Sequence, residues 1–321
     1  MNNIKRNKDL STNIISFLKT RRSIFVKILN LWHPLRNRLF ALWGVKDGYF
    51  SLKDFFALLL PVSFTQKREI IPKYDEFLNK KFKQQISPFI LKDGSISIFN
   101  KSFYGISYQE SIELINDVIA SDQYSAKKYL SERSVVIDAG GNIGTFSVFA
   151  ANLSPNGYVY AFEPVKKTFE LLKKNTHHYH QIKCINAGLG ENRSVKKIFI
   201  NNKSTGGSVF EDSPFYTGTS DAGQGGRFEE AEIMTLDYFV YENKISQVDF
   251  IKIDTEGYEA NVLRGAKETI QKFRPVIAMS AYHNQNDKKD LPFILKSIYA
   301  DYICELHNDH EEDFLCYVKN K

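Results

Sequence analysis

The stretch Val135-Val-Ile-Asp-Ala-Gly-Gly-Asn-Ile-Gly144 decides the fold. Its apolar start ends at Asp138, and glycines follow at 140, 141 and 144. A glycine-rich turn between a strand and a helix is where an open α/β sheet lets a ligand approach the backbone. Gly140 and Gly141 can adopt positive φ angles, and Gly144 lets the helix pack closely on the strand. The stretch predicts the first ligand-binding turn of a doubly wound sheet.

The residues after this turn repeat a rhythm of strand, turn and helix. Such alternation indicates a largely parallel sheet with helices on both faces. A Gly/Ser-rich stretch at 201–231 interrupts the rhythm and predicts a long mobile loop. The helical patterns lie at 143–152, 166–177 and 258–266, and the candidate strands are Val135–Asp138, Tyr158–Phe162, Ile182–Asn186, Val248–Ile253, Val276–Met279, Tyr302–Glu305 and Leu315–Val318.

Two acidic residues at strand ends point to the ligand. Asp138 stands directly before the glycines, where it can face the amino group of a methionyl moiety, directly or through water. Glu163 follows Gly144 by nineteen residues and can accept hydrogen bonds from both ribose hydroxyls of an adenosine. The order D-A-G-G-N-I-G differs from the GxGxxG turn that serves a dinucleotide pyrophosphate. We predict S-adenosyl-L-methionine as the cofactor, bound by Asp138, Gly140, Gly141, Asn142, Gly144, Glu163 and Asn186.

Each polar residue of this set also has a purely structural interpretation. Asp138 could cap the turn, and Glu163 could be a solvated acid before Pro164. Asn186, which we place near the adenine, could be an ordinary asparagine at a strand end. The spacing of the two acids around the glycine turn favours cofactor binding over these alternatives.

The segment Val248-Asp-Phe-Ile-Lys-Ile-Asp-Thr-Glu-Gly-Tyr-Glu-Ala-Asn-Val-Leu-Arg-Gly-Ala266 resembles the hallmark of the FkbM family of S-adenosylmethionine-dependent methyltransferases. Further matches are Tyr160-Ala-Phe-Glu-Pro164, Thr235-Leu-Asp237 and Ala281-Tyr-His-Asn-Gln-Asn-Asp287. The resemblance covers about residues 124–318. It implies a seven-stranded Rossmann-like class I methyltransferase sheet, mostly parallel with the last strand antiparallel. It also implies methyl transfer, usually to oxygen and often on sugars, polysaccharides or secondary metabolites.

The family pattern differs from this chain at the turn, since members commonly carry a small residue, often Ala, where Gly141 stands. The stretch at 201–231 is a second departure and leaves the substrate preference of the family unassigned here.

Three side chains at strand ends are candidates for proton transfer, and we predict Asp254, Glu256 and His283 as catalytic residues. A histidine can act as a general base near neutral pH, and a carboxylate such as Asp287, four residues on, can orient it. Glu256 could instead cap the following helix, and capping is the better interpretation of Glu259. His283 could instead only hydrogen-bond to loop backbone.

Asp254, Glu256 and His283 could alternatively hold a divalent cation that acidifies an acceptor hydroxyl. No tight ligand motif supports this alternative, so we predict no metal. The predicted function is O-methylation of a sugar hydroxyl on a glycan, polysaccharide or glycosylated metabolite. A binding protein that retains the fold, attached to a membrane or complex, is the first alternative. An NAD-dependent oxidoreductase is less favoured because of the turn sequence.

The basic charge of the chain lies in its first residues. Residues 1–40 carry nine Lys and Arg against Asp9, a charge of +8, so that the net +6 leaves −2 for the rest. The slightly acidic core argues against nucleic acid as a partner. Between Ile14 and Trp43, apolar residues recur at helical spacing around Pro34. This amphipathic pattern predicts a packing face on the core or in a homo-oligomer, or else peripheral contact with a membrane.

The domain prediction is a basic, largely helical region at 1–94 and a methyltransferase domain at 95–321. A hairpin is expected around Asp93-Gly94. Cys184, Cys304 and Cys316 are odd in number and far apart, which favours buried thiols in a reducing compartment. No secretory signal pattern and no apolar run of membrane-spanning length is present. We therefore expect a cytoplasmic protein, with attachment to the inner face of the membrane as the alternative.

Overall fold

The computed structural model describes residues 89–90, 96–99, 101–105, 111, 114–200, 208–212, 227–307 and 312–319. The chain divides into two compact units, residues 1–99 and 100–321. In the first unit, β1 (Phe89–Ile90) pairs antiparallel with β2 (Ile96–Ile98), which confirms the predicted hairpin. The boundary predicted after residue 94 stays a prediction. The helical pattern from Ile14 to Trp43 lies outside the described residues.

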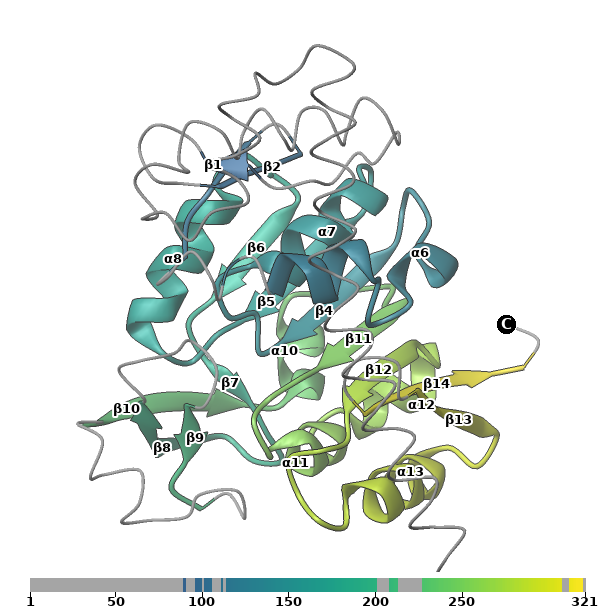
Figure 1. The fold of residues 1–321 in the computed structure, drawn as a ribbon. Coiled ribbons are helices and arrows are strands. Elements are labelled where there is room, and N and C mark those ends of the chain that lie inside the picture. The colour runs from purple at the N-terminus through teal and green to yellow at the C-terminus, as the bar shows by residue number, and fades with distance from the viewer. Residues whose placement is uncertain are drawn as a thin grey trace, which may run out of the picture. The chain divides into compact units, whose positions relative to one another are not determined.

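Within its described part, the second unit is built around a seven-stranded sheet in the order β13-β14-β12-β11-β4-β5-β6 (Figure 1). Strands β12, β11, β4, β5 and β6 run parallel, and β14 is antiparallel to both of its neighbours. This confirms the predicted sheet. The strands are β4 (Val135–Ala139), β5 (Tyr158–Phe162), β6 (Ile182–Ile185), β11 (Phe250–Ile253), β12 (Val276–Ser280), β13 (Tyr302–His307) and β14 (Asp313–Val318).

Helices cover the sheet on both faces (Figure 1). Helix α7 packs against α8, and α10 packs against α12, while α11 packs against α13. None of the helices in the described ranges is long and apolar enough to cross a membrane. The helices of the described ranges are the π-helix η1 (Asn116–Ala120), α6 (Ala126–Tyr129), α7 (Thr145–Leu153), α8 (Lys166–Thr176), α10 (Leu236–Glu242), α11 (Glu259–Arg264), α12 (Lys267–Phe273) and α13 (Asp287–Ile298). The short strand β3 (Lys101–Phe103) precedes them in the chain.

An isoleucine ladder fixes the centre of the sheet. Ile137 of β4, Ile251 of β11 and Ile277 of β12 are neighbours in register, and all three are fully buried. Burying such a side chain contributes about 1.5–3 kcal/mol, so a slip in register would be costly. The same register sets Lys252 beside Asp138. The apolar strands therefore position the polar residues at their carboxyl ends.

A second sheet, in the order β7-β10-β8-β9, follows β6 in the chain. Its strands are β7 (Gly188–Leu189), β8 (Ser194–Ile200), β9 (Val209–Phe210) and β10 (Arg227–Met234). The predicted loop at 201–231 is therefore wrong at 209–210 and 227–231. Ala231 and Ile233 alternate with exposed acids and pack in a small core with Phe210. Residues 201–207 and 213–226 lie outside the described residues.

The prediction that all three cysteines are thiols is wrong for two of them. Cys304 of β13 and Cys316 of β14 lie opposite each other in register and form a disulfide. Cys184 has a free thiol. The sequence does not show this pairing, because it depends on the register of the two strands.

Candidate active site

The glycine turn needs glycine at two of its three predicted positions. Gly140 and Gly144 have φ angles of 78° and 95°. A Cβ on Gly140 would lie 1.9 Å from the backbone oxygen of Asp254, so no side chain fits there. Gly141 does not adopt a positive φ angle, and a Cβ there would meet Ala161 Cβ at 3.4 Å, an ordinary contact. Asn142 instead takes the left-handed conformation, with φ 47°.

Asp138 lies beneath this turn at the end of β4 and is fully buried. Its Oδ2 accepts a hydrogen bond from Ser147 Oγ at 2.5 Å, and its Oδ1 lies 3.3 Å from Lys252 Nζ. Burial raises the pKa of its carboxyl, although Lys252 and Ser147 act to lower it. Because Asp138 has no exposed surface, its contact with a cofactor stays a prediction.

Lys252 is a site residue that sequence reasoning missed. It lies in β11 with its side chain 5% exposed, and its Nζ is 3.3 Å from Asp138 and 3.7 Å from Asp254. The same nitrogen donates to the Gly140 carbonyl at 2.6 Å. Burial alone would lower the pKa of Lys252, but the two carboxylates raise it above its ordinary value. The sequence signal for this residue was a lysine within an otherwise apolar strand. Because buried lysines are almost always paired, such a lysine predicts an acidic partner nearby.

Glu163 follows β5 and is 6% exposed. Its Oε2 accepts a hydrogen bond from the Asn142 N–H at 3.0 Å, and its Oε1 accepts one from the Val165 N–H at 2.9 Å. Burial raises the pKa of Glu163 to about 7. Asn186 supports this loop, since its Nδ2 donates to the carbonyls of Glu163 and Pro164 at 2.9 and 3.1 Å.

A cleft joins the two groups of residues predicted from the sequence. It encloses about 580 Å³ of empty space, including open solvent at its mouth. The cofactor candidates Gly140, Asn142 and Glu163 line it together with Asp254 and Glu256. The second sheet contributes apolar and polar walls. The other lining residues are Pro164, Val165, Gly188, Leu189, Ile198, Ser208, Phe210 and Thr255.

Asp254 follows β11 directly and borders both halves of the cleft. Its Oδ2 accepts a hydrogen bond from Tyr124 Oη at 3.0 Å, and its Oδ1 accepts one from Ser280 Oγ at 3.1 Å. Its backbone N–H donates to Ala139 at 3.1 Å, which ties it to the glycine turn. Burial acts to raise the pKa of Asp254, but Lys252 and His283 lower it below its ordinary value. Asp254 is therefore an anion at neutral pH.

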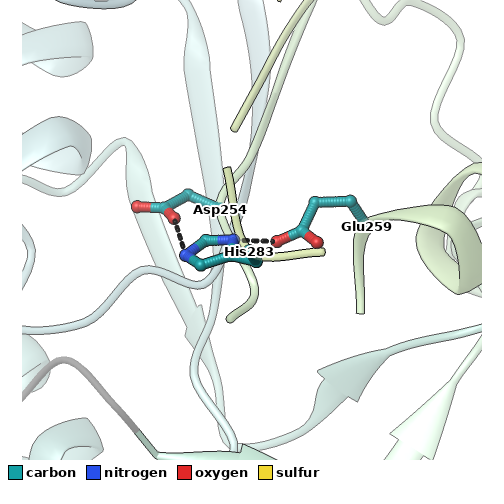
Figure 2. A group of neighbouring side chains, drawn as sticks. All are labelled: Asp254, Glu259 and His283. Atoms are coloured by element: carbon teal, nitrogen blue, oxygen red, sulfur yellow. Dashed lines mark hydrogen bonds and ion pairs between the residues drawn. The ribbon is translucent and has the colours of Figure 1, made fainter. Parts of the chain in front are cut away.

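His283 follows β12 and lies between acidic side chains, as Figure 2 shows for Asp254 and Glu259. Its Nδ1 is 3.0 Å from Glu259 Oε1. Its Nε2 is 3.5 Å from Glu256 Oε2 and 3.9 Å from Asp254 Oδ1. Burial alone would lower the pKa of His283, but Glu259, with Asp254 and Glu256, raises it to about 9. The structure thus brings the three predicted catalytic residues together.

The carboxylate that contacts His283 Nδ1 is Glu259, whereas the sequence favoured Asp287 as the partner of this histidine. Asp287 begins α13, and its Oδ2 accepts the backbone N–H of Asn284 at 2.7 Å. Glu259 does cap the preceding turn, since its Oε1 accepts the N–H groups of Thr255 and Gly257 at 2.9 and 3.2 Å. The sequence favoured a helix cap for Glu259, whereas these N–H groups belong to the turn before α11, and the contact of Glu259 with His283 was missed.

Asp254, Glu259 and His283 are also the described residues whose geometry could suit a metal ion. Each offers one ligand atom, and these atoms all lie within 4.8 Å of one another. The set differs from the alternative considered from the sequence, which contained Glu256. Because Glu259 and His283 already hydrogen-bond to each other, a cation would have to displace that bond. The absence of a metal stays a prediction.

Comparisons with known proteins match most of the second unit to methyltransferases. The methyltransferase FkbM domain family matches residues 138–314. Methyltransferase 1 of Beauveria bassiana is 27% identical over 166 residues, which cover 48% of this chain and 67% of that protein. Hexuronic acid methyltransferase AglP of Haloferax volcanii is 28% identical over 186 residues, which cover 57% of this chain and 70% of that protein.

One solved structure matches part of the chain. Methyltransferase FkbM from Methylobacillus flagellatus KT superposes with a TM-score of 0.43 at 20% identity. The match covers 65% of this chain, and the chain spans about half of that protein, 54% of its length. The matched family segment holds more than half of the chain, from Asp138 to Phe314. The chain belongs to the FkbM methyltransferase family.

Proposed function

We propose that the protein is an S-adenosylmethionine-dependent O-methyltransferase that acts on a sugar hydroxyl of a glycan, polysaccharide or glycosylated metabolite. The observation that carries this proposal is the single cleft lined by the glycine turn, Glu163, Asp254 and Glu256. Methyl transfer requires a donor and an acceptor to meet in line, and the enzyme must mainly position the acceptor and take its proton.

The residues of the turn fit the proposed cofactor. Asn142 Oδ1 is shielded from solvent and has no hydrogen-bond partner among the described residues. Glu163 holds one backbone N–H on each oxygen, and a carboxylate can accept about four hydrogen bonds, so each oxygen can take another donor. Gly140 lets the ligand approach the backbone, because it carries no side chain. Unsatisfied acceptors in such a cleft suit the ribose hydroxyls and ammonium group of S-adenosylmethionine.

The acidic half of the cleft suits the reacting group. S-adenosylmethionine supplies, when bound, an electrophilic methyl group on a cationic sulfonium. The carboxylate of Asp254 can accept a hydrogen bond from an acceptor hydroxyl and so direct its oxygen. In the neutral form of the His283 ring, Nε2, 3.5 Å from Glu256 and 3.9 Å from Asp254, is the atom to which we assign the hydroxyl proton. Because the pKa of His283 is raised to about 9, this form of the ring increases as the pH rises toward that value. Taking up that proton is worth about 10²–10⁴-fold in rate.

A sugar hydroxyl is the favoured acceptor because of one relative. AglP, named as a hexuronic acid methyltransferase, aligns with this chain over 186 residues. The carboxylates that line the cleft also suit a polyhydroxylated ligand, since they accept hydrogen bonds from hydroxyl groups.

Calorimetry tests the cofactor assignment. We expect S-adenosylmethionine and S-adenosylhomocysteine to bind and NAD not to bind. In Glu163→Ala we expect affinity for both nucleosides to fall about tenfold or more, because the hydrogen bonds between the ribose hydroxyls and the Glu163 carboxyl are lost. Exposed Glu170→Ala serves as the control, since its partner Lys173 is also exposed.

Binding of NAD alone would overturn the proposal, and equal affinity of the Glu163→Ala variant would remove the ribose contact. Mass spectrometry of glycans and metabolites, with and without active protein, then identifies the acceptor by a mass gain of one CH₂.

A further inference from the structure

We infer that Glu259 is the positioning residue of His283: its buried carboxylate holds the Nδ1–H of the imidazole and turns Nε2 toward Asp254 and Glu256. The chemical purpose of this arrangement rests on the proposed function. The arrangement itself rests on contacts within the second unit.

The contact between the two residues is short and shielded. Glu259 has no exposed surface, and its Oε1 lies 3.0 Å from His283 Nδ1. The side chain of His283 is 2% exposed. In Figure 2 the carboxylate of Glu259 points at the ring, which has Asp254 on its other side. A carboxylate without a proton can only accept a hydrogen bond, so Nδ1 must be the donor.

A helix cap alone does not account for the position of Glu259. Carboxylates at helix starts are usually solvated, and complete burial of a charge is costly unless it is paired. Glu259 Oε2 accepts no hydrogen bond from any described residue, which adds to that cost. The turn before the helix is also strained at Glu256, which has a left-handed φ angle of 54°, whereas Gly257 adopts its φ of 90° without strain. The pairing with His283 offsets these costs.

The geometry determines which nitrogen can react. Because Nδ1 is hydrogen-bonded to Glu259, Nε2 is the ring nitrogen that can exchange a proton with an acceptor. In the methyl transfer step, the hydroxyl O–H bond breaks and its proton goes to Nε2. The O–CH₃ bond forms as the CH₃–S bond breaks, and the electron pair of that bond remains on sulfur. The imidazolium so formed lies among carboxylates that stabilise it.

Among the described residues, acids from three elements face His283. Glu259 comes from the start of α11, Asp254 and Glu256 from the turn after β11, and Asp287 from the start of α13. Of these acids, Glu259 makes the shortest contact with the ring, at 3.0 Å from Nδ1. Removing its charge should therefore lower the pKa of His283, by about one unit or more.

The test is Glu259→Gln, with Glu268→Gln as a matched control. Glu268 lies in the first turn of the neighbouring helix α12 and is exposed. The pH dependence of kcat/KM reports titration of the free enzyme. In the wild type and in Glu268→Gln we expect kcat/KM to rise with pH through an acidic limb near 9. In Glu259→Gln the limb should move to lower pH by about one unit or more, and the plateau should fall at least about tenfold.

Nuclear magnetic resonance of the His283 ring gives a readout that does not depend on turnover. His283→Gln assigns the resonance. The same downward shift is expected in Glu259→Gln, and above pH 9 the neutral ring of the wild type should carry its proton on Nδ1. An unchanged pKa in Glu259→Gln, or a proton on Nε2 in the wild type, would overturn the inference. If no cofactor binds and nothing is methylated, the proposed function fails, while these ring measurements still decide the role of Glu259.

Discussion

The two halves of the cleft are built in different ways. The half that includes Gly140, Asn142 and Glu163 is made largely by backbone: left-handed turns and N–H groups held by one carboxylate. The half that includes Asp254 and Glu256 depends on side chains, and His283, which follows a separate strand, lies within 4 Å of both carboxylates. Lys252 joins them, because it contacts Asp138 on one side and Asp254 on the other. The backbone half therefore depends on particular φ angles, and the side-chain half depends on opposite charges that balance one another.

Gly140→Ala should have the largest effect on the backbone half. Its Cβ would lie 1.9 Å from the Asp254 carbonyl oxygen, and its φ of 78° disfavours any side chain. We expect loss of S-adenosylmethionine binding in calorimetry, with soluble protein much reduced. Gly141→Ala is the matched control, because its Cβ would make only ordinary contacts at 3.4 Å. Equal binding by both variants would show that the turn is not the cofactor site.

Lys252→Met should weaken both halves at once. It leaves Asp138 and Asp254 without the buried cation between them, and breaking a buried pair costs about 3–5 kcal/mol. Without Lys252 the folded-state pKa of each acid rises, and an acid with a raised folded pKa loses stability as pH rises. The free energy of unfolding in urea should therefore fall more at pH 8 than at pH 5. Exposed Lys272→Met is the control, and a loss that does not vary with pH would contradict this account.

The backbone half was predictable from sequence because its signal is local. The apolar strand, the glycines and Asp138 lie within ten residues, and the positive φ angles at Gly140 and Gly144 follow from that spacing. The prediction could not show that Asn142, rather than Gly141, would take the left-handed conformation. Both are permitted there, and the choice depends on packing against β5.

The side-chain half was predictable in its members and less so in its contacts. Asp254 and His283 follow neighbouring parallel strands, so their proximity follows from the strand order. The bond from Glu259 to His283 spans 24 residues and depends on a strained turn at Glu256. The second sheet was hidden for a different reason. Its strand β10 is half exposed and acidic, and only Ala231 and Ile233 are buried at alternate positions. This weak alternation follows a glycine-rich stretch, which indicated a loop.

Asn142→Gly should give the smallest effect and the finest test of the backbone half. Asn142 holds φ 47°, which glycine adopts without strain, so the free energy of unfolding should change by less than about 1 kcal/mol. The change also removes Oδ1, a buried acceptor without a partner among the described residues. If that oxygen binds the cofactor, affinity for S-adenosylmethionine should fall about tenfold or less, since one hydrogen bond is worth about 0.5–1.5 kcal/mol. Lys244→Gly, at an exposed residue with φ 51°, should match the stability change and leave affinity unaltered. If Asn142→Gly also leaves the affinity for S-adenosylmethionine unaltered, the turn binds the cofactor through its backbone and not through the Asn142 side chain.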